Sequence, residues 1–325
     1  MTNGEVYKKT LVFSVKRLIF NTICVLVILA LSTAGFLIVE KMSDNGLIGL
    51  GIGLVFGIII VAVLAHFMAY TYKAGQIAMM TRAVTEGSLP DDVYGEGKRV
   101  VKEKFLTVAV YYAATKLIQR IFNEIGKLIT GAGKAIGGDT GEGIAGAVNI
   151  GIQVVIGFLS DCCLGWVFYR KDLSSGKATL EGAGIFFKHG KTLIKNLGRI
   201  FGIGILSLAL IGGALFGIFY LIFSNLPEAF RSLSNEIIQI VQKEGETVSI
   251  WISDPGHLAI IAAGIIALVI WFIIHGAFVR PFILVGVLRN YMESGMAHMP
   301  TEADMAEVAK KSGKFADLQK KVDKA

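Results

Sequence analysis

Cysteine, proline and charged residues are all scarce in this sequence of 325 residues. It contains 3 cysteines and 5 prolines, and 18% of its residues are charged, whereas about 25% are charged in a typical soluble domain. Cys162 and Cys163 are adjacent and only Cys24 remains, so a disulfide framework is excluded. The low charge also excludes a disordered chain and argues against an ordinary soluble enzyme.

The common catalytic motifs are missing as well. Neither His-Glu-x-x-His nor Gly-x-Ser-x-Gly occurs, and the glycine-rich stretch at 131–135 lacks the spacing of a phosphate-binding loop. The net charge of +7 is spread over many loops, which does not predict nucleic-acid binding. We therefore expect no enzymatic activity, no cofactor and no bound metal.

Long apolar runs dominate what is present, since 54% of the residues are hydrophobic. A run of about 20 apolar residues is long enough to cross a bilayer as a helix. This pattern predicts an all-α, polytopic membrane protein with six transmembrane helices arranged as three hairpins, within one domain over residues 1–300. The predicted spans are 18–39, 47–72, 105–129, 144–169, 200–223 and 258–279.

The distribution of Lys and Arg predicts the orientation. With these spans, most of the basic residues in loops fall on one side, and only Lys41, Lys134, Arg231 and Lys243 fall on the other. Because basic loops stay in the cytoplasm, we expect a multi-pass protein of the bacterial or archaeal cell membrane with both termini cytoplasmic.

The same bias in Lys and Arg requires that both central helices cross the bilayer or that neither does. Four spans, with 105–169 at the cytoplasmic interface, are the alternative.

The segment 105–129 is strongly amphipathic. Its charged residues recur every three or four positions and so share one helical face. Such a stripe is expected either to line a hydrated path or to lie among lipid headgroups, and an oligomeric pore is a third possibility. The stripe consists of Lys116, Arg120, Glu124 and Lys127.

His66, Asp161 and His275 fall in the second, fourth and sixth predicted spans, close to the cytoplasmic ends. Ionisable groups inside a membrane mark functional sites by default, so these three could hold a cation or relay protons, together with a neighbouring cysteine. The alternative is that each histidine bonds to a neighbouring helix and that Asp161 pairs with Lys116 or Arg120.

Basic and amphipathic segments at the edges of the bilayer predict contacts with lipid. One basic cluster precedes the fifth span and is expected to meet anionic headgroups, unless it only sets the orientation. Residues 226–241 predict an interfacial helix on the outer side, and residues 301–325 predict a cytoplasmic amphipathic or flexible tail that contacts the membrane, a protein partner or a second copy. The basic cluster consists of Lys188, Lys191, Lys195 and Arg199.

Basic lead-in segments at 4–9, 97–102 and 190–195 each precede an apolar hairpin, which is consistent with threefold internal repetition or with ordinary orientation signals. This layout resembles uncharacterised bacterial and archaeal membrane proteins that look like the membrane domain of some glycerophosphodiester phosphodiesterases. The resemblance implies no catalytic residue, because the soluble phosphodiesterase domain is missing. We expect a non-enzymatic membrane scaffold or accessory subunit. The alternative is a small-solute or ion transporter that uses the charged stripe and the His/Asp groups.

Overall fold

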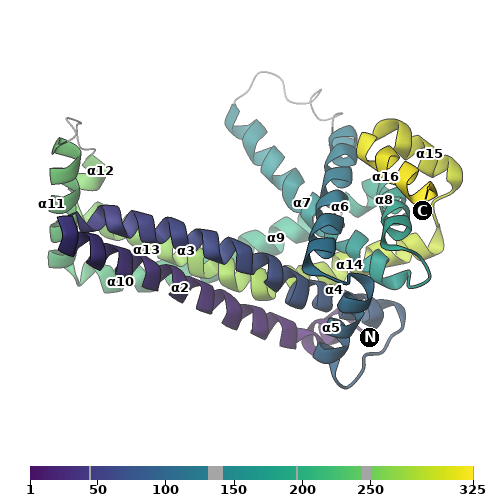
Figure 1. The fold of residues 1–325 in the computed structure, drawn as a ribbon, viewed down its shortest axis with the longest axis horizontal. Helices are drawn as coiled ribbons and strands as arrows, with labels where there is room; N and C mark the ends of the chain where they lie inside the picture. Colours follow the sequence, from purple (N-terminus) through teal and green to yellow (C-terminus); the bar gives the residue numbers. More distant parts are fainter. Residues whose placement is uncertain (44, 131–141, 195–196, 244–249, 325) are drawn as a thin grey trace. The chain divides into compact units, whose positions relative to one another are not determined.

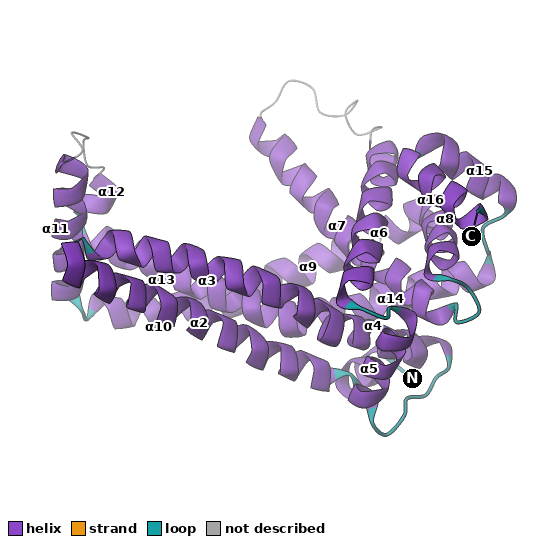
Figure 2. Cartoon of the chain, in the orientation of Figure 1, coloured by secondary structure: helices purple, strands orange, loops and turns teal. Residues whose placement is uncertain are grey.

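Helices form the regular structure of the described residues, and no strand occurs among them (Figure 2). The predicted all-α fold class is therefore confirmed. The structure is a computed structural model, in which the chain divides into two units, Met1–Ile200 with Pro281–Ala325 and Phe201–Arg280. It describes all residues except 44, 131–141, 195–196, 244–249 and 325. The side chains of 126–130, 142–150, 152, 191–194, 197–199, 240, 243, 250 and 252 also lie outside the description.

The first unit begins with a long apolar hairpin. Helix α1 (Asn3–Lys9) leads into α2 (Leu11–Ser43), and the chain then turns back into α3 (Gly46–Met68) (Figure 1). The two long helices approach so closely that a Cβ on Gly49 would overlap the carbonyl oxygen of Gly35. Glycine at both positions permits this approach. Their outward faces carry exposed leucine and isoleucine side chains, which suit contact with lipid rather than water.

The second helix of the hairpin continues directly into a buried helix. After α3, the π-helical turn η1 (Ala69–Lys73) leads into α4 (Ala74–Thr85). The residues of α4 are buried from Ala74 through Thr81. Helix α5 (Val93–Lys104) packs against α4, and its first turn is capped by Asp92, whose carboxylate accepts a hydrogen bond from the Gly95 backbone N–H at 2.8 Å.

Helices α6 (Val108–Thr130), α7 (Glu142–Tyr169), α8 (Ser175–Ile194) and α14 (Arg280–Ala297) complete the core of this unit. Large aromatic side chains fill the space between them. The buried set includes Phe122, Trp166, Phe186 and Tyr291. The rings of Phe122 and Phe186 stack with centroids 4.7 Å apart, and the Tyr291 hydroxyl donates to the Gly182 carbonyl oxygen at 2.5 Å. We call α1, α4–α8 and residues 281–323 the helical domain.

The C-terminal residues form two short helices, α15 (Glu302–Lys311) and α16 (Gly313–Asp323), which pack against α6 and α8 (Figure 1). Their apolar residues Val308, Phe315 and Leu318 are buried. The sequence predicts an amphipathic or flexible tail over 301–325. In the structure its apolar residues pack within the chain, and contacts of the tail with a membrane or a partner stay a prediction.

The second unit contains another apolar hairpin. Helix α9 (Leu197–Ser207) passes through the π-helical turn η3 (Leu208–Gly212) into α10 (Gly213–Ser224), which packs against α13 (Pro255–Ile274). The buried face of α13 carries alanines at every fourth position, which allow the helices to approach closely.

A segment that is itself partly helical connects α10 to α13. It contains α11 (Pro227–Lys243), the predicted helix at 226–241, and α12 (Ile250–Ser253). The Ser234 hydroxyl of α11 donates to the Ser253 carbonyl oxygen at 2.9 Å. Both helices pack against α13, and after α13 the unit ends with the π-helical turn η4 (His275–Val279).

Within the described residues, 4 helices are long and apolar enough to cross a membrane. They include the predicted spans 18–39, 47–72, 200–223 and 258–279. The predicted spans 105–129 and 144–169 are not among these four helices. Of 144–169, the described side chains include the shorter apolar helix Gln153–Tyr169. Six spans are therefore not confirmed, because α6 is amphipathic and the side chains of the first part of α7 lie outside the described residues. The candidate spans are Leu11–Ser43, Gly46–Thr85, Ile200–Ser224 and Pro255–Ala297.

Candidate functional site

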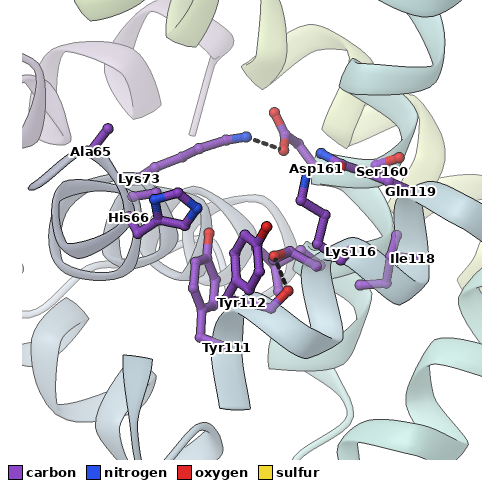
Figure 3. A pocket seen from close by; sticks show the side chains of 13 residues that line it. Ala65, His66, Lys73, Tyr111, Tyr112, Lys116, Ile118, Gln119, Ser160 and Asp161 are labelled. Atoms are coloured by element: carbon purple, nitrogen blue, oxygen red, sulfur yellow. Dashed lines mark hydrogen bonds and ion pairs between the residues drawn. The ribbon is translucent and has the colours of Figure 1, made fainter. Parts of the chain in front are cut away.

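A cavity of about 220 Å³ lies in the first unit, where the end of α3 and the turn η1 meet α6 and α7. We call it the η1 cavity. Its wall is mixed, with alanine and leucine beside tyrosine, lysine, serine and aspartate side chains (Figure 3). Three of the residues predicted from sequence line it: His66, Lys116 and Asp161.

A buried ion pair closes one side of the cavity. The Lys73 ammonium of η1 lies 2.6 Å from a carboxylate oxygen of Asp161, which projects from the otherwise apolar α7 (Figure 3). The Asp161 side chain is only 7% exposed and the Lys73 side chain is 29% exposed. Because a carboxylate this deeply buried is costly without a partner, the pair fixes η1 against α7.

A hydrogen-bonded cluster of three polar side chains joins α2 to α4 in the same unit. The Arg17 guanidinium donates to the Gln76 side-chain oxygen at 3.2 Å, and the Gln76 amide nitrogen donates to the Ser14 hydroxyl at 3.0 Å. All three residues are buried. These bonds fix the register of the two helices where the apolar hairpin meets the helical domain.

Tyr111 occupies the cavity wall beside this ion pair. Burial, together with the nearby negative charge of Asp161, raises the pKa of its phenol above the ordinary value. The Tyr111 phenol is therefore neutral at physiological pH and can act as a hydrogen-bond donor. Its ring meets that of Tyr70 edge to face, with centroids 5.7 Å apart.

The three residues of the predicted ion or proton site have different environments. His66 and Asp161 line the η1 cavity. His275 belongs to the second unit, where its Nδ1 atom lies 3.3 Å from the Ser207 hydroxyl and its ring packs on Trp271. Among the residues that the structure describes, no group of three or more His, Cys, Asp and Glu side chains could hold a metal ion.

The predicted charged stripe of α6 also divides. Lys116 lines the η1 cavity and Arg120 is exposed. Glu124 instead accepts hydrogen bonds from the Ser312 hydroxyl at 2.6 Å and from the Lys314 backbone N–H at 3.1 Å. It therefore holds the start of α16, and the side chain of Lys127 lies outside the described residues.

One member of the predicted anionic-lipid cluster has a protein partner. The Lys188 ammonium lies 2.9 Å from the carboxylate of Asp304 in α15. Hydrogen bonds from Thr301, together with Lys188, hold the pKa of Asp304 at about 2. Lys188 thus docks the C-terminal helices, and the side chains of Lys191, Lys195 and Arg199 lie outside the description.

Sequence reasoning did not identify Lys73 or Ser160 as site residues. Lys73 follows His66 by seven positions, two helical turns, and this spacing could have placed the two residues on one wall. Ser160 carries no comparable signal. It is 5% exposed, and its hydroxyl has no hydrogen-bond partner among the described residues.

A second cavity, of about 330 Å³, lies between α4, α5 and the end of α7. Its charged groups satisfy one another. Glu96 pairs with Arg82 at 3.2 Å and with Arg99 at 2.7 Å, and the Lys104 ammonium donates to the carbonyl oxygens of Arg170 and Leu173. These contacts join α5 to its neighbours and give this cavity a structural role.

Comparison of the chain with protein-family models, curated proteins and solved structures finds no match.

Proposed function

We propose that the chain is a four-span integral membrane protein whose helical domain lies at the cytoplasmic face. In this proposal it acts as a non-enzymatic scaffold or accessory subunit of a membrane complex. The two apolar hairpins anchor the protein in the bilayer, and the helical domain presents a folded surface to other components at the membrane.

One observation carries this proposal, the abrupt change of burial along a single continuous helix. Val63 and Phe67 of α3 are 68% and 54% exposed, although both are apolar. From Ala74 through Thr81, the residues of α4 are buried in the helical domain. An apolar surface left uncovered beside a well-packed core is expected where a chain leaves lipid and enters a protein domain.

The contacts of the N-terminus support an even number of spans. Arg289 of α14 donates to the Asn3 side-chain oxygen at 2.6 Å and to the Met1 carbonyl oxygen at 2.7 Å. These contacts place the N-terminus in the same folded unit as α14, which supports placing both ends of the chain on one side of the bilayer.

The basic residues favour four spans over six. With α6 and α7 outside the bilayer, only Lys41, Arg231 and Lys243 remain on the side opposite the helical domain. All other Lys and Arg residues then lie on the side of the helical domain, including the charged stripe of α6. Because Lys and Arg concentrate in cytoplasmic segments, this arrangement supports a cytoplasmic helical domain.

The packing of α6 also supports this placement. Its apolar side chains Ile118, Ile121, Phe122 and Ile125 are buried within the unit, and Glu124 is bonded to the C-terminal helix. Glu124 is thus a structural contact of the stripe, which supports a scaffold over the transporter alternative.

The function test compares transport with complex formation. The full chain is reconstituted in liposomes, and fluxes of protons, potassium and small anions are measured against protein-free liposomes. A scaffold gives no added flux. Added flux that is lost in Asp161→Asn and kept in the exposed control Asp172→Asn would instead establish a transporter.

Complex formation is measured in native membranes. We expect crosslinking followed by mild detergent extraction to give one stoichiometric complex that contains this chain. A single uncomplexed chain under these conditions would overturn the scaffold proposal.

A further inference from the structure

The η1 cavity lies at the depth of the lipid headgroups, if the proposed membrane placement holds. No acidic or basic residue occurs between Gly46 and His66, a stretch of about 30 Å at 1.5 Å per residue. This length matches the hydrocarbon thickness of a bilayer. Ala65 through Lys73, which contribute to the cavity wall, therefore fall where the hydrocarbon layer ends.

A cluster of tyrosines marks the same depth. Tyr72 packs on Tyr94 with ring centroids 6.3 Å apart, and Tyr70 packs on Tyr111. Tyr112 packs on the His66 ring at 4.6 Å. Tyrosine is enriched at membrane–water interfaces because its ring is apolar and its hydroxyl is polar. The cluster supports the position of the cavity independently of helix length.

Two donors on the cavity wall pair with no carboxylate among the described residues. The Lys116 ammonium lies 5.5 Å from the centroid of the Tyr112 ring and forms no ion pair with any carboxylate among the described residues. The buried Ser160 hydroxyl has no hydrogen-bond partner among them either. The buried position of the Ser160 hydroxyl costs free energy that a bound ligand would recover. Lys116 is exposed and contributes positive charge to the cavity wall.

We propose that the η1 cavity binds the phosphodiester group of a phospholipid headgroup, with Lys116 and Ser160 as donors to its oxygens. Lys73 adds positive charge, and Asp161 partly neutralises it. The site therefore suits the single negative charge of a phosphodiester better than the double charge of a phosphomonoester. The volume of about 220 Å³ is below the usual range for drug-sized ligands, so a headgroup fits whereas a whole lipid does not.

The test measures lipid retained by the purified full chain. The protein in mild detergent is titrated with short-chain phosphatidylglycerol, and binding is followed by native mass spectrometry. Lys116→Gln and Ser160→Ala are each expected to weaken binding about tenfold, the effect of removing one charge-assisted or otherwise unpaired hydrogen bond. Arg120→Gln is the matched control, because Arg120 lies one turn from Lys116 on α6 and is exposed as Lys116 is, but it is not part of the cavity wall.

Three outcomes would overturn the proposal. The first is equal binding by Lys116→Gln, Ser160→Ala and Arg120→Gln. The second is equal retention of a phosphate-free galactolipid by the unaltered chain. The third is full competition by soluble glycerophosphoglycerol at concentrations that match the lipid, which would assign the site to a free phosphodiester instead.

This titration is independent of the flux and complex measurements. A transporter could still bind the lipid, and a scaffold could fail to bind it. Circular dichroism and the thermal midpoint of each variant verify that it is folded, and a variant that fails this check is replaced by Lys116→Met or Ser160→Gly.

Discussion

At the scale of single residues, the buried ion pair of the η1 cavity gives the clearest prediction. Lys73→Met removes an ion-pair partner of a carboxylate that is only 7% exposed. We expect the free energy of unfolding to fall by about 3 kcal/mol, because a buried charge loses this ion pair. The measurement is chemical denaturation in detergent micelles, with the exposed Lys177→Met as the control. The double variant Lys73→Met/Asp161→Leu should regain most of the loss, and a single variant as stable as the control would contradict the account.

Asp304 gives a prediction about pH. Its pKa is about 2 in the folded chain, below the ordinary value of about 3.9 in an unfolded chain. The stabilisation is therefore complete above pH ~4 and is lost as the pH falls toward 2. We expect α15 and α16 to become increasingly susceptible to pepsin over this interval. Asp304→Asn should be cleaved more readily at pH 4 and should change less between pH 4 and 2, whereas equal pH profiles would count against the docking contact.

Other residues show what a linear pattern cannot reveal. Glu124 belongs to a charged face that was predictable, but its partner is Ser312, which is 188 positions away. The spacing of charges along one helix does not tell whether that face meets water, lipid or another helix. Ser160 is an ordinary polar residue in an apolar helix. Only the surrounding packing shows that its hydroxyl is buried and has no hydrogen-bond partner in the described part of the chain.

At the scale of elements, the hairpin of α2 and α3 depends on close contact at glycine. A side chain on Gly49 would overlap the Gly35 backbone, whereas a Cβ on Gly51 would meet no atom within 4 Å. We expect Gly49→Val to destabilise the protein by about 1–3 kcal/mol, since it overpacks a tight contact. Gly51→Val is the matched control. Equal thermal midpoints for the two variants would show that the helices do not pack as described.

The sequence predicted an element correctly where the length of an apolar run was enough to define it. Four apolar runs were long and continuous enough to stand out, and each lies within a candidate span. The segment 105–129 was ambiguous because an amphipathic helix suits an interface, a hydrated path or the surface of a protein core equally well. Its apolar face is buried in the helical domain, a result of tertiary packing that periodicity alone does not contain.

At the scale of the whole molecule, the account depends on whether the segment between α3 and α9 stays on one side of the bilayer. Four spans keep it in the cytoplasm, and six spans place residue 134 outside. The proposed scaffold role needs the first arrangement, because only then does the helical domain form in water at the cytoplasmic face.

The most direct measurement is labelling of Lys134→Cys with a membrane-impermeant maleimide, in a chain whose Cys24, Cys162 and Cys163 are replaced by alanine. Lys98→Cys and Arg231→Cys serve as the cytoplasmic and external controls. The account predicts that Lys134→Cys in intact cells stays unlabelled, as Lys98→Cys does, and reacts only after the membrane is opened. Labelling of intact cells at the rate of Arg231→Cys would contradict it.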